Sequence, residues 1–564
     1  MNLSGHIGTC ICLFVFTACT SLANECAPFY CSFDDTDAMV QSGGTMNGAL
    51  TFPPGVNGTA VNFGGATSVR FITTLFDTPN GSVSLWFKKN SPDEKGGILE
   101  IGRLGTPDSI GIFYANSNNL YFEMRNSANQ HTVAYAENVL FQTTYNHIVV
   151  IWDRRADVYH MKLFINGRYL GGSTLSAPFA HSHGFMDVGV AGVGEWYGNG
   201  RGMIDELRFF DWALSDGEVY AEYVYSSKRY RNQPTNKPIS TGPVKLSGRS
   251  LTVDDEPFTI KGVGYQPVPI GMSPDRATLD HIFTDPEIIQ RDVAYLRRMN
   301  VNTIRLWAQL PDTTLLDALE AVGIYAIMAF QVPATTDIPG IDYSDPATVA
   351  FYTNGITDYV NQFKNHPAVL AWAIGNENNL HYKKDMSDWY KLANKLAQAA
   401  YEAEKPSYHP TILVNGYMLF FGDVDYSSDD ASLDYVDIWG HNNYIRYDYH
   451  SYFCYYGRIS AKPLVMTEFG VDAYGPGLQW ENQHVQAEWV THEWEQVRDN
   501  CIGGTVMEYC DEWWKCGSPS THDLCGYYTC DIERFDRAPK PLGKKCIVAR
   551  QKNTSSAEKG RMSS

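Results

Sequence analysis

The chain of 564 residues exceeds the size at which a single hydrophobic core keeps growing, so we expect two domains. Its apolar and charged fractions, 44% and 19%, are those of a globular protein. The formal net charge of −19 excludes electrostatic attraction to nucleic acid or to an anionic membrane surface, whereas a neutral polymer is compatible with it. The 13% aromatic fraction suits sugar binding, because an aromatic face packs against the apolar C–H face of a pyranose, although most aromatic side chains are core residues.

The first residues of the chain predict a secretory signal. The apolar run from Ile11 to Ala18 is too short to span a bilayer and small residues follow it, so residues 1–23 fit a signal peptide cleaved after Ala23. Lipid attachment at Cys19 is the alternative. No later stretch is long and apolar enough for a membrane span, and we therefore expect a secreted protein.

Cysteines are concentrated towards the end of the chain. Nine of the twelve remain after removal of the signal, and six of them lie between Cys501 and Cys546. In an oxidising compartment this spacing predicts local disulfides, with at least one thiol left free because the number is odd. A zinc site is the alternative, but the nine cysteines contain no Cys-x-x-Cys pair.

Residues 24–226 predict an all-β sandwich. Ser82–Phe87 and Thr144–Trp152 alternate between apolar and polar residues, and Met161–Arg168 runs into an Asn-Gly hairpin turn. The region ends with Asp205-Glu-Leu-Arg-Phe-Phe and then Ala213-Leu-Ser-Asp before a short acidic helix. This ending resembles the last strand of laminin-G-like, concanavalin-type jelly rolls. The resemblance implies a domain that often binds carbohydrate, in some members with structural calcium; a structural spacer is the alternative.

Residues 227–245 are polar, basic and rich in proline, and predict a linker. In residues 246–546 strand-length apolar runs alternate with helical patterns, the order that builds a parallel sheet. Eight such runs predict a (β/α)8 barrel, and we expect residues 547–564 to be a disordered tail. The predicted strands are Phe258–Gly264, Thr303–Trp307, Ala326–Phe330, Leu370–Gly375, Ile412–Val414, Ile438–His441, Leu464–Thr467 and Gly504–Tyr509.

Two glutamates stand at the carboxyl ends of predicted strands, where the catalytic side chains of such barrels lie. Glu377 closes the fourth strand as Gly-Asn-Glu, and Glu468 closes the seventh as Thr-Glu-Phe-Gly. A carboxyl group at the end of an apolar strand is costly unless it is paired or functional. The two residues are therefore the leading catalytic candidates.

These strand ends resemble the clan of retaining glycosidases that includes family 2 β-glycosidases and family 72 β-1,3-glucanosyltransferases. Residues 260–267 are similar to the first strand of the glucanosyltransferases, and residues 301–307, with Arg305, match the second strand of the clan. His441-Asn-Asn-Tyr444 fits the sixth strand, and Trp513-Trp514 follow the eighth. The resemblance spans about residues 246–520, although a laminin-G-like domain stands where family 2 enzymes carry their own sandwiches.

The resemblance implies the chemistry of each position. Retaining glycosidases use two carboxyl groups about 5–5.5 Å apart, one as acid/base and one as nucleophile. Glu377 takes the first role and Glu468, which must begin ionised, takes the second, with Arg305 as its counter-charge. Tyr444 donates a hydrogen bond to the nucleophile and Asn376 holds the sugar 2-hydroxyl. The further candidates for substrate binding are Trp513, Trp514, Tyr265, His441 and Asn443, although a core position is equally compatible with His441.

The sequence predicts an enzyme that hydrolyses a β-linked polysaccharide or oligosaccharide by a retaining double displacement. Two alternatives stay open: transfer of a glucan chain with the same two glutamates, or a carbohydrate-binding protein that has lost catalysis. We expect no metal and no cofactor for catalysis, because the sequence contains no phosphate-binding glycine loop and no metal-ligand cluster. The sugar, the linkage and the oligomeric state do not follow from the sequence.

Overall fold

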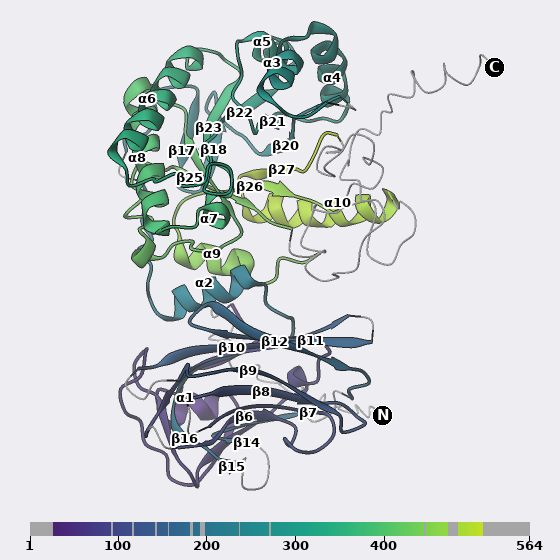
Figure 1. Ribbon diagram of the computed structural model, residues 1–564, viewed down its shortest axis with the longest axis vertical. Helices are drawn as coiled ribbons and strands as arrows, with labels where there is room; N and C mark the ends of the chain where they lie inside the picture. Colours follow the sequence, from purple (N-terminus) through teal and green to yellow (C-terminus); the bar gives the residue numbers. More distant parts are fainter. Residues whose placement is uncertain are drawn as a thin grey trace, which may run out of the picture. The chain divides into compact units, whose positions relative to one another are not determined.

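The computed structural model describes residues 26–510 apart from 92–93, 116–117, 141–143, 156, 181–183, 192–197, 236, 270–271, 445–446 and 472–482. The chain divides into two compact units, Met1–Leu214 and Ser215–Ser564 (Figure 1). The predicted signal, the predicted tail, Trp513 and Trp514 lie outside the described residues. No helix among the residues described is long and apolar enough to cross a membrane.

The first unit consists of two seven-stranded antiparallel sheets. One has the order β1-β16-β5-β10-β11-β12 with β3 paired to β16, and the other has the order β2-β4-β13-β6-β7-β8-β9. The first sheet contains β1 (Phe29–Cys31), β3 (Val61–Gly64), β5 (Gly81–Lys89), β10 (Asn146–Arg155), β11 (Val158–Ile165), β12 (Arg168–Ser176) and β16 (Arg201–Phe210). The second contains β2 (Gly44–Asn47), β4 (Ser68–Ile72), β6 (Gly96–Ile101), β7 (Ser109–Tyr114), β8 (Leu120–Arg125), β9 (His131–Ala136) and β13 (Phe185–Val188).

The sheets of the first unit share one apolar core, to which alternate residues such as Val83 and Leu85 of β5 contribute. Asn166 and Gly167, at φ 50° and 74°, form the two-residue turn between β11 and β12 that the sequence predicts. A helix, α1 (Thr36–Gln41), and a small hairpin of β14 (Val190–Ala191) and β15 (Gly198–Asn199) complete the unit. The predicted all-β domain is confirmed as an antiparallel arrangement consistent with a jelly roll.

The second unit contains a closed barrel of eight parallel strands, and all eight predicted strands take part in it. They are β20 (Ile260–Gly264), β21 (Thr303–Arg305), β22 (Tyr325–Phe330), β23 (Val369–Ile374), β24 (Thr411–Gly416), β25 (Ile438–Asn442), β26 (Leu464–Phe469) and β27 (Gly503–Val506). A three-stranded sheet of β17 (Val244–Ser247), β18 (Ser250–Val253) and β19 (Glu256–Pro257) precedes them in the chain.

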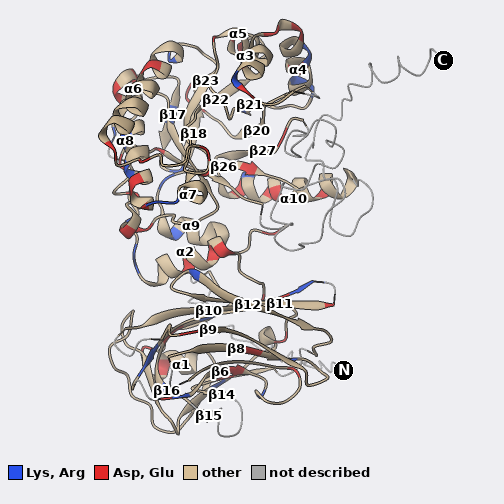
Figure 2. Cartoon of the chain, viewed as in Figure 1, with Lys and Arg blue, Asp and Glu red and all other residues tan. Residues whose placement is uncertain are grey.

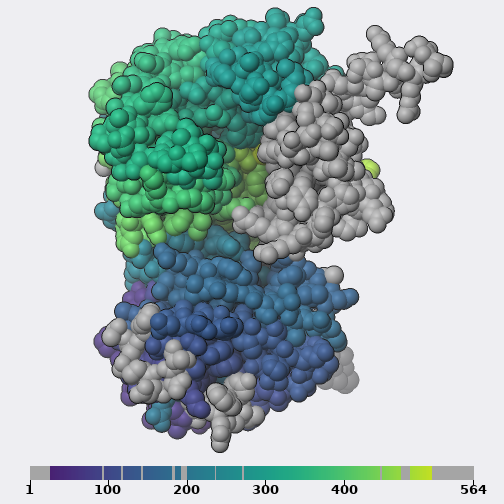
Figure 3. Space-filling view, in the orientation of Figure 1, coloured from purple at the N-terminus to yellow at the C-terminus, as the bar shows by residue number. Residues whose placement is uncertain are grey.

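Helices connect most of the barrel strands, and those between β20 and β24 form the teal and green surface of this unit in Figure 3. Between β24 and β25 the described residues contain a 3-10 helix, η3 (Val424–Tyr426), in place of an α-helix. The α-helices are α2 (Asp216–Ser226), α3 (Arg276–Thr284), α4 (Pro286–Arg298), α5 (Thr314–Glu320), α6 (Pro346–Phe363), α7 (Asn378–His381), α8 (Met386–Glu404), α9 (Tyr452–Ile459) and α10 (Gln483–Asn500). Asp285 caps α4, and a proline lies in the first turn of this helix.

Helix α2, which the sequence assigns to the end of the sandwich domain, and the predicted linker both belong to the second unit. Glu222 of α2 accepts a hydrogen bond from the Tyr455 hydroxyl of α9 at 2.6 Å, so this helix belongs to the barrel unit. Within the stretch 227–245, which the sequence presents as a linker, Arg231 pairs with the fully buried Asp429 at 2.8 Å. Lys237 pairs with Asp437 at 2.6 Å. Acidic and basic residues are interspersed along the ribbons of both units (Figure 2).

Candidate active site

Glu468 lies at the carboxyl end of β26 and is almost fully buried, with 5% of its surface exposed. Three side chains donate to its carboxylate. Arg305 of β21 donates from Nη1 to Oε1 at 2.5 Å, and the Trp307 indole nitrogen donates to the same oxygen at 2.8 Å. The Tyr444 hydroxyl donates to Oε2. Because each of these bonds stabilises the negative form, the pocket is built to keep Glu468 ionised.

The indole of Trp307, which bonds this carboxylate, packs closely against the backbone of Gly264. A Cβ added to Gly264, at the end of β20, would lie 2.1 Å from the Trp307 ring, so a glycine is needed there for the indole to fit. The guanidinium of Arg305 lies 4.9 Å from the centre of the same ring. Gly264 and Arg305 thus both contact the indole.

Glu377 follows β23 in a left-handed backbone conformation, with φ 55° and ψ 27°, and caps the amino end of α7. The left-handed conformation costs free energy for any residue with a side chain. Residues that adopt it despite this cost cluster at functional sites. Asn442 of β25 donates from Nδ2 to Glu377 Oε1 at 2.9 Å. On the other oxygen, His381 Nε2 lies 3.8 Å from Oε2, one helical turn along α7. The side chain of Glu377 is 22% exposed, so it is partly accessible to solvent.

A continuous set of hydrogen bonds joins the two carboxyl groups. Asn376 Oδ1 accepts from Arg305 Nη2 at 2.6 Å and from Asn442 Nδ2 at 3.1 Å. Asn442 Oδ1 in turn accepts from the Thr467 hydroxyl at 2.8 Å, next to Glu468 in the chain. The sequence-predicted residues Glu377, Glu468, Arg305, Asn376 and Tyr444 therefore lie in one cluster at one end of the barrel.

Of the remaining predicted residues, Tyr265 and His441 have side chains bonded elsewhere, and Asn443 adjoins the cluster through its backbone. Trp513 and Trp514 lie outside the described part of the chain. Tyr265 is fully buried, donates to Asp292 at 3.2 Å and packs on Tyr509. His441 is fully buried behind the barrel wall, where its Nδ1 lies 2.7 Å from the Tyr452 hydroxyl, and burial lowers the pKa of its imidazole to about 3. Asn443 is buried and donates its backbone N–H to the Glu468 carbonyl at 2.8 Å.

Asn442 and Trp307 belong to the cluster but were not predicted from the sequence. Strand alternation could have found both. Trp307 lies two residues after Arg305 and therefore on the same face of the chain. Asn442 lies two residues before Tyr444, whereas the neighbouring His441, which was chosen, points to the opposite face.

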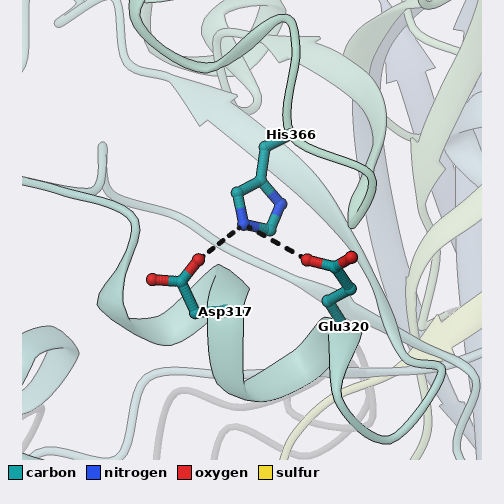
Figure 4. Close-up of side chains that lie close together, drawn as sticks. All are labelled: Asp317, Glu320 and His366. Carbon is teal, nitrogen blue, oxygen red and sulfur yellow. Dashed lines mark hydrogen bonds and ion pairs between the residues drawn. The ribbon is translucent and has the colours of Figure 1, made fainter.

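One other group of side chains, among the described residues, could bring three metal-ligating atoms together: Asp317, Glu320 and His366 (Figure 4). His366 Nε2 lies 3.0 Å from Asp317 Oδ1 and 3.8 Å from Glu320 Oε2. His366 Nδ1 accepts the Ala368 N–H at 3.1 Å, so the proton of the neutral ring is on Nε2 and points at Asp317. A metal needs the lone pair of Nε2, so this tautomer favours a hydrogen bond, which lowers the pKa of the exposed Asp317.

Comparison with known sequence families assigns both units. Residues 63–220 match the concanavalin A-like lectin/glucanases superfamily, and residues 236–523 match the family described as glucanosyltransferase, which covers more than half of the chain. The chain belongs to the glucanosyltransferase family. The resemblances predicted from the strand ends and from the last strand of the sandwich are thereby confirmed.

Individual relatives of this glucanosyltransferase-family chain match only in part. The 1,3-beta-glucanosyltransferase gel2 of Aspergillus fumigatus is 26% identical over 293 residues, which cover 48% of this chain and 58% of the relative. The probable 1,3-beta-glucanosyltransferase GAS3 of Saccharomyces cerevisiae is 32% identical over 145 residues, 25% of this chain and 26% of the relative. The chain thus spans less than two thirds of either relative. A GH2 beta-galacturonidase structure from Eisenbergiella tayi is 14% identical, with a TM-score of 0.39, and covers 84% of this chain and 66% of that chain.

Proposed function

We propose that this chain is a retaining β-1,3-glucan transglycosylase, with Glu468 as nucleophile and Glu377 as acid/base. The observation that carries the proposal is the hydrogen-bonded set around the two glutamates in a chain of the glucanosyltransferase family. Membership of that family favours transfer, which the sequence left as an alternative, over hydrolysis, its first prediction.

The two carboxyl groups have different surroundings, as a double displacement requires. Glu468 receives three donors, one of them a buried cation, and attacks the anomeric carbon as a carboxylate. Glu377 gives its proton to the departing glycosidic oxygen and later removes a proton from the incoming hydroxyl group, so that no proton is gained or lost over the cycle. The Asn442 bond fixes Glu377 Oε1, while Oε2 lies 3.8 Å from His381 Nε2.

Asn376 is the candidate for holding the sugar 2-hydroxyl. Its Oδ1 already accepts from Arg305 and Asn442, which orients the amide so that its Nδ2 is available to donate. A hydrogen bond from this donor to the 2-hydroxyl stabilises the charge that develops at the transition state. This bond strengthens as the bond to the leaving group breaks.

Product analysis separates the two reactions. The protein is incubated with a β-1,3-gluco-oligosaccharide labelled at its reducing end, and the chain lengths are followed over time. Transfer yields labelled chains longer than the donor, because the acceptor keeps its own labelled reducing end, whereas only shorter products and uptake of solvent oxygen would establish a hydrolase. Products of inverted anomeric configuration, or activity that survives Glu468→Ala, would contradict the assigned roles.

We also propose that the protein works outside the cell. Cys26 and Cys454 each take part in a disulfide, and disulfides persist in oxidising compartments. An extracellular protein has access to polymeric glucan outside the membrane, which is the proposed substrate. Detection of the protein in the culture medium of its host, free of residues 1–23, tests this location.

The first unit contains a carboxylate that suits structural calcium, which the concanavalin-type resemblance implies for some members. Asp205 is fully buried; its Oδ2 accepts the N–H groups of Val56 and Asn57 at 2.7 and 3.0 Å, while Oδ1 has no hydrogen-bond partner among the residues described. Burial raises the pKa of Asp205 to about 7. The carboxylate of Asp34 binds the same loop through the Thr59 N–H. We propose that Asp205 and Asp34 hold a calcium ion, which prefers carboxylate oxygens.

A further inference from the structure

Three aromatic residues form a row across the second sheet of the first unit. Phe113 of β7 is paired directly with Tyr121 of β8, and Tyr121 is paired directly with Tyr135 of β9. Their neighbours in sequence, such as Ile112 and Phe122, are buried in the core, so the row lies on the outer face of the sheet. Register alone therefore aligns three rings at right angles to the strands.

The rings of this row have nearly the same orientation. The Phe113 and Tyr121 rings are stacked with centres 5.1 Å apart and planes 6° apart, and the Tyr121 and Tyr135 rings with centres 6.2 Å and planes 20° apart. These separations are those of offset parallel stacking, in which part of each face stays uncovered. Tyr135, the end ring, is 53% exposed, so the series is open to an additional flat apolar face.

The outer face next to the row carries an ion pair and an apolar side chain. On the next row of this face Glu123 is buried in an ion pair with Arg125 at 2.6 Å, and the side chain of Leu104 lies over Gly111. Beyond the end ring, the neighbouring strand β12 has Gly171, whose Cβ position would lie 3.0 Å from the Tyr135 carbonyl oxygen. Arg125 thus neutralises the charge of Glu123 on this face, and Gly171 has no side chain that could cover β9.

We propose that the row of Phe113, Tyr121 and Tyr135 is a docking site for the β-glucan chain on which the second unit acts. A pyranose offers a flat C–H face to the rings and hydroxyl groups to the two phenolic oxygens, one of which accepts from Asn119 Nδ2 at 3.4 Å. A neutral glucan also meets no repulsion from a chain of net charge −19. The identity of the sugar rests on the proposed function; the presence of a flat, neutral, hydroxyl-bearing ligand does not.

The proposal is tested by glucan binding in the absence of turnover. Affinity electrophoresis with a soluble linear β-1,3-glucan is carried out on the full chain carrying Glu468→Ala, alone and combined with Tyr135→Ala or Tyr121→Ala. Tyr169→Ala is the matched control, because Tyr169 of β12 is 54% exposed and lies outside the row. Loss of stacking on one ring weakens binding by about threefold to tenfold, and the control leaves it unchanged.

Equal binding by the parent and both row variants, with thermal unfolding showing that they are folded, overturns the proposal. So does sedimentation showing that Tyr135→Ala dissociates a dimer, since the row would then bind a second copy of the chain. A β-1,4-glucan retained more tightly than the β-1,3-glucan, with the same dependence on Tyr135, supports the site and contradicts the sugar taken from the proposed function. Transfer activity of the unmodified protein is measured separately, so either idea can fail alone.

Discussion

Asn442→Ala removes a side chain that bonds both Glu377 and Asn376, at 2.9 and 3.1 Å. A hydrogen bond to a charged group contributes about 1.5–3 kcal/mol, and each 1.4 kcal/mol of lost transition-state stabilisation is about tenfold in rate. We therefore expect kcat/KM for an oligosaccharide donor to fall by about tenfold to a hundredfold. The Thr467 hydroxyl also loses its acceptor, which costs about 1–3 kcal/mol of folding free energy.

The choice of donor shows whether this loss acts through Glu377. The fluoride ion of an oligosaccharyl fluoride leaves without a proton from the acid, so the initial burst of fluoride release reports attack by Glu468 alone. In the Asn442→Ala protein the burst rate should fall by less than about threefold, while the natural donor shows the full loss. Equal losses on both donors would refute the reasoning, because Asn442 would then act on the whole site. Asn415→Ala is the control: Asn415 is equally buried but bonds the Tyr390 hydroxyl at 3.0 Å, and its loss should affect both donors alike.

Three further outcomes are expected. Arg305→Met leaves the buried Glu468 without its cation, which should cost about 3–5 kcal/mol of stability in urea unfolding and abolish transfer; retained activity would contradict the role of the ion pair. Because burial lowers the pKa of His441 to about 3, the unfolded chain binds the extra proton between pH 6.5 and 3, so stability falls with falling pH by about 1.4 kcal/mol per unit, and His441→Gln should flatten this limb. Calcium removal by a chelator should lower the Tm of the first unit in calorimetry, and Asp205→Asn should make that Tm insensitive to calcium.

Local patterns predicted the elements of the barrel because strands and helix caps depend on near neighbours. The strand ends at Glu377 and Glu468 could be recognised as sites for the same reason. Helix α8 is an example of such local coding, because it begins at Met386 directly after its cap, Asp385, which accepts the Ser387 N–H.

What sequence could not give is which face of a strand end enters the site. His441, Asn442 and Asn443 are three successive polar residues, so alternation between apolar and polar residues does not distinguish their faces. The pairing of β25 with β26, together with an irregularity in its register next to Asn442, decides it. Burial of Tyr265 against Asp292 of α4 is likewise a contact between distant segments, which no local pattern encodes.

The donors that hold Glu468 come from segments far apart in the chain, β21 with Trp307 behind it, and the loop that follows β25. They meet only when the cylinder of strands is closed. A nascent or partly unfolded chain therefore carries the nucleophilic side chain without the groups that keep it charged and aimed. The proposed reactivity towards glucan therefore requires the closed barrel, and an incompletely assembled barrel lacks it.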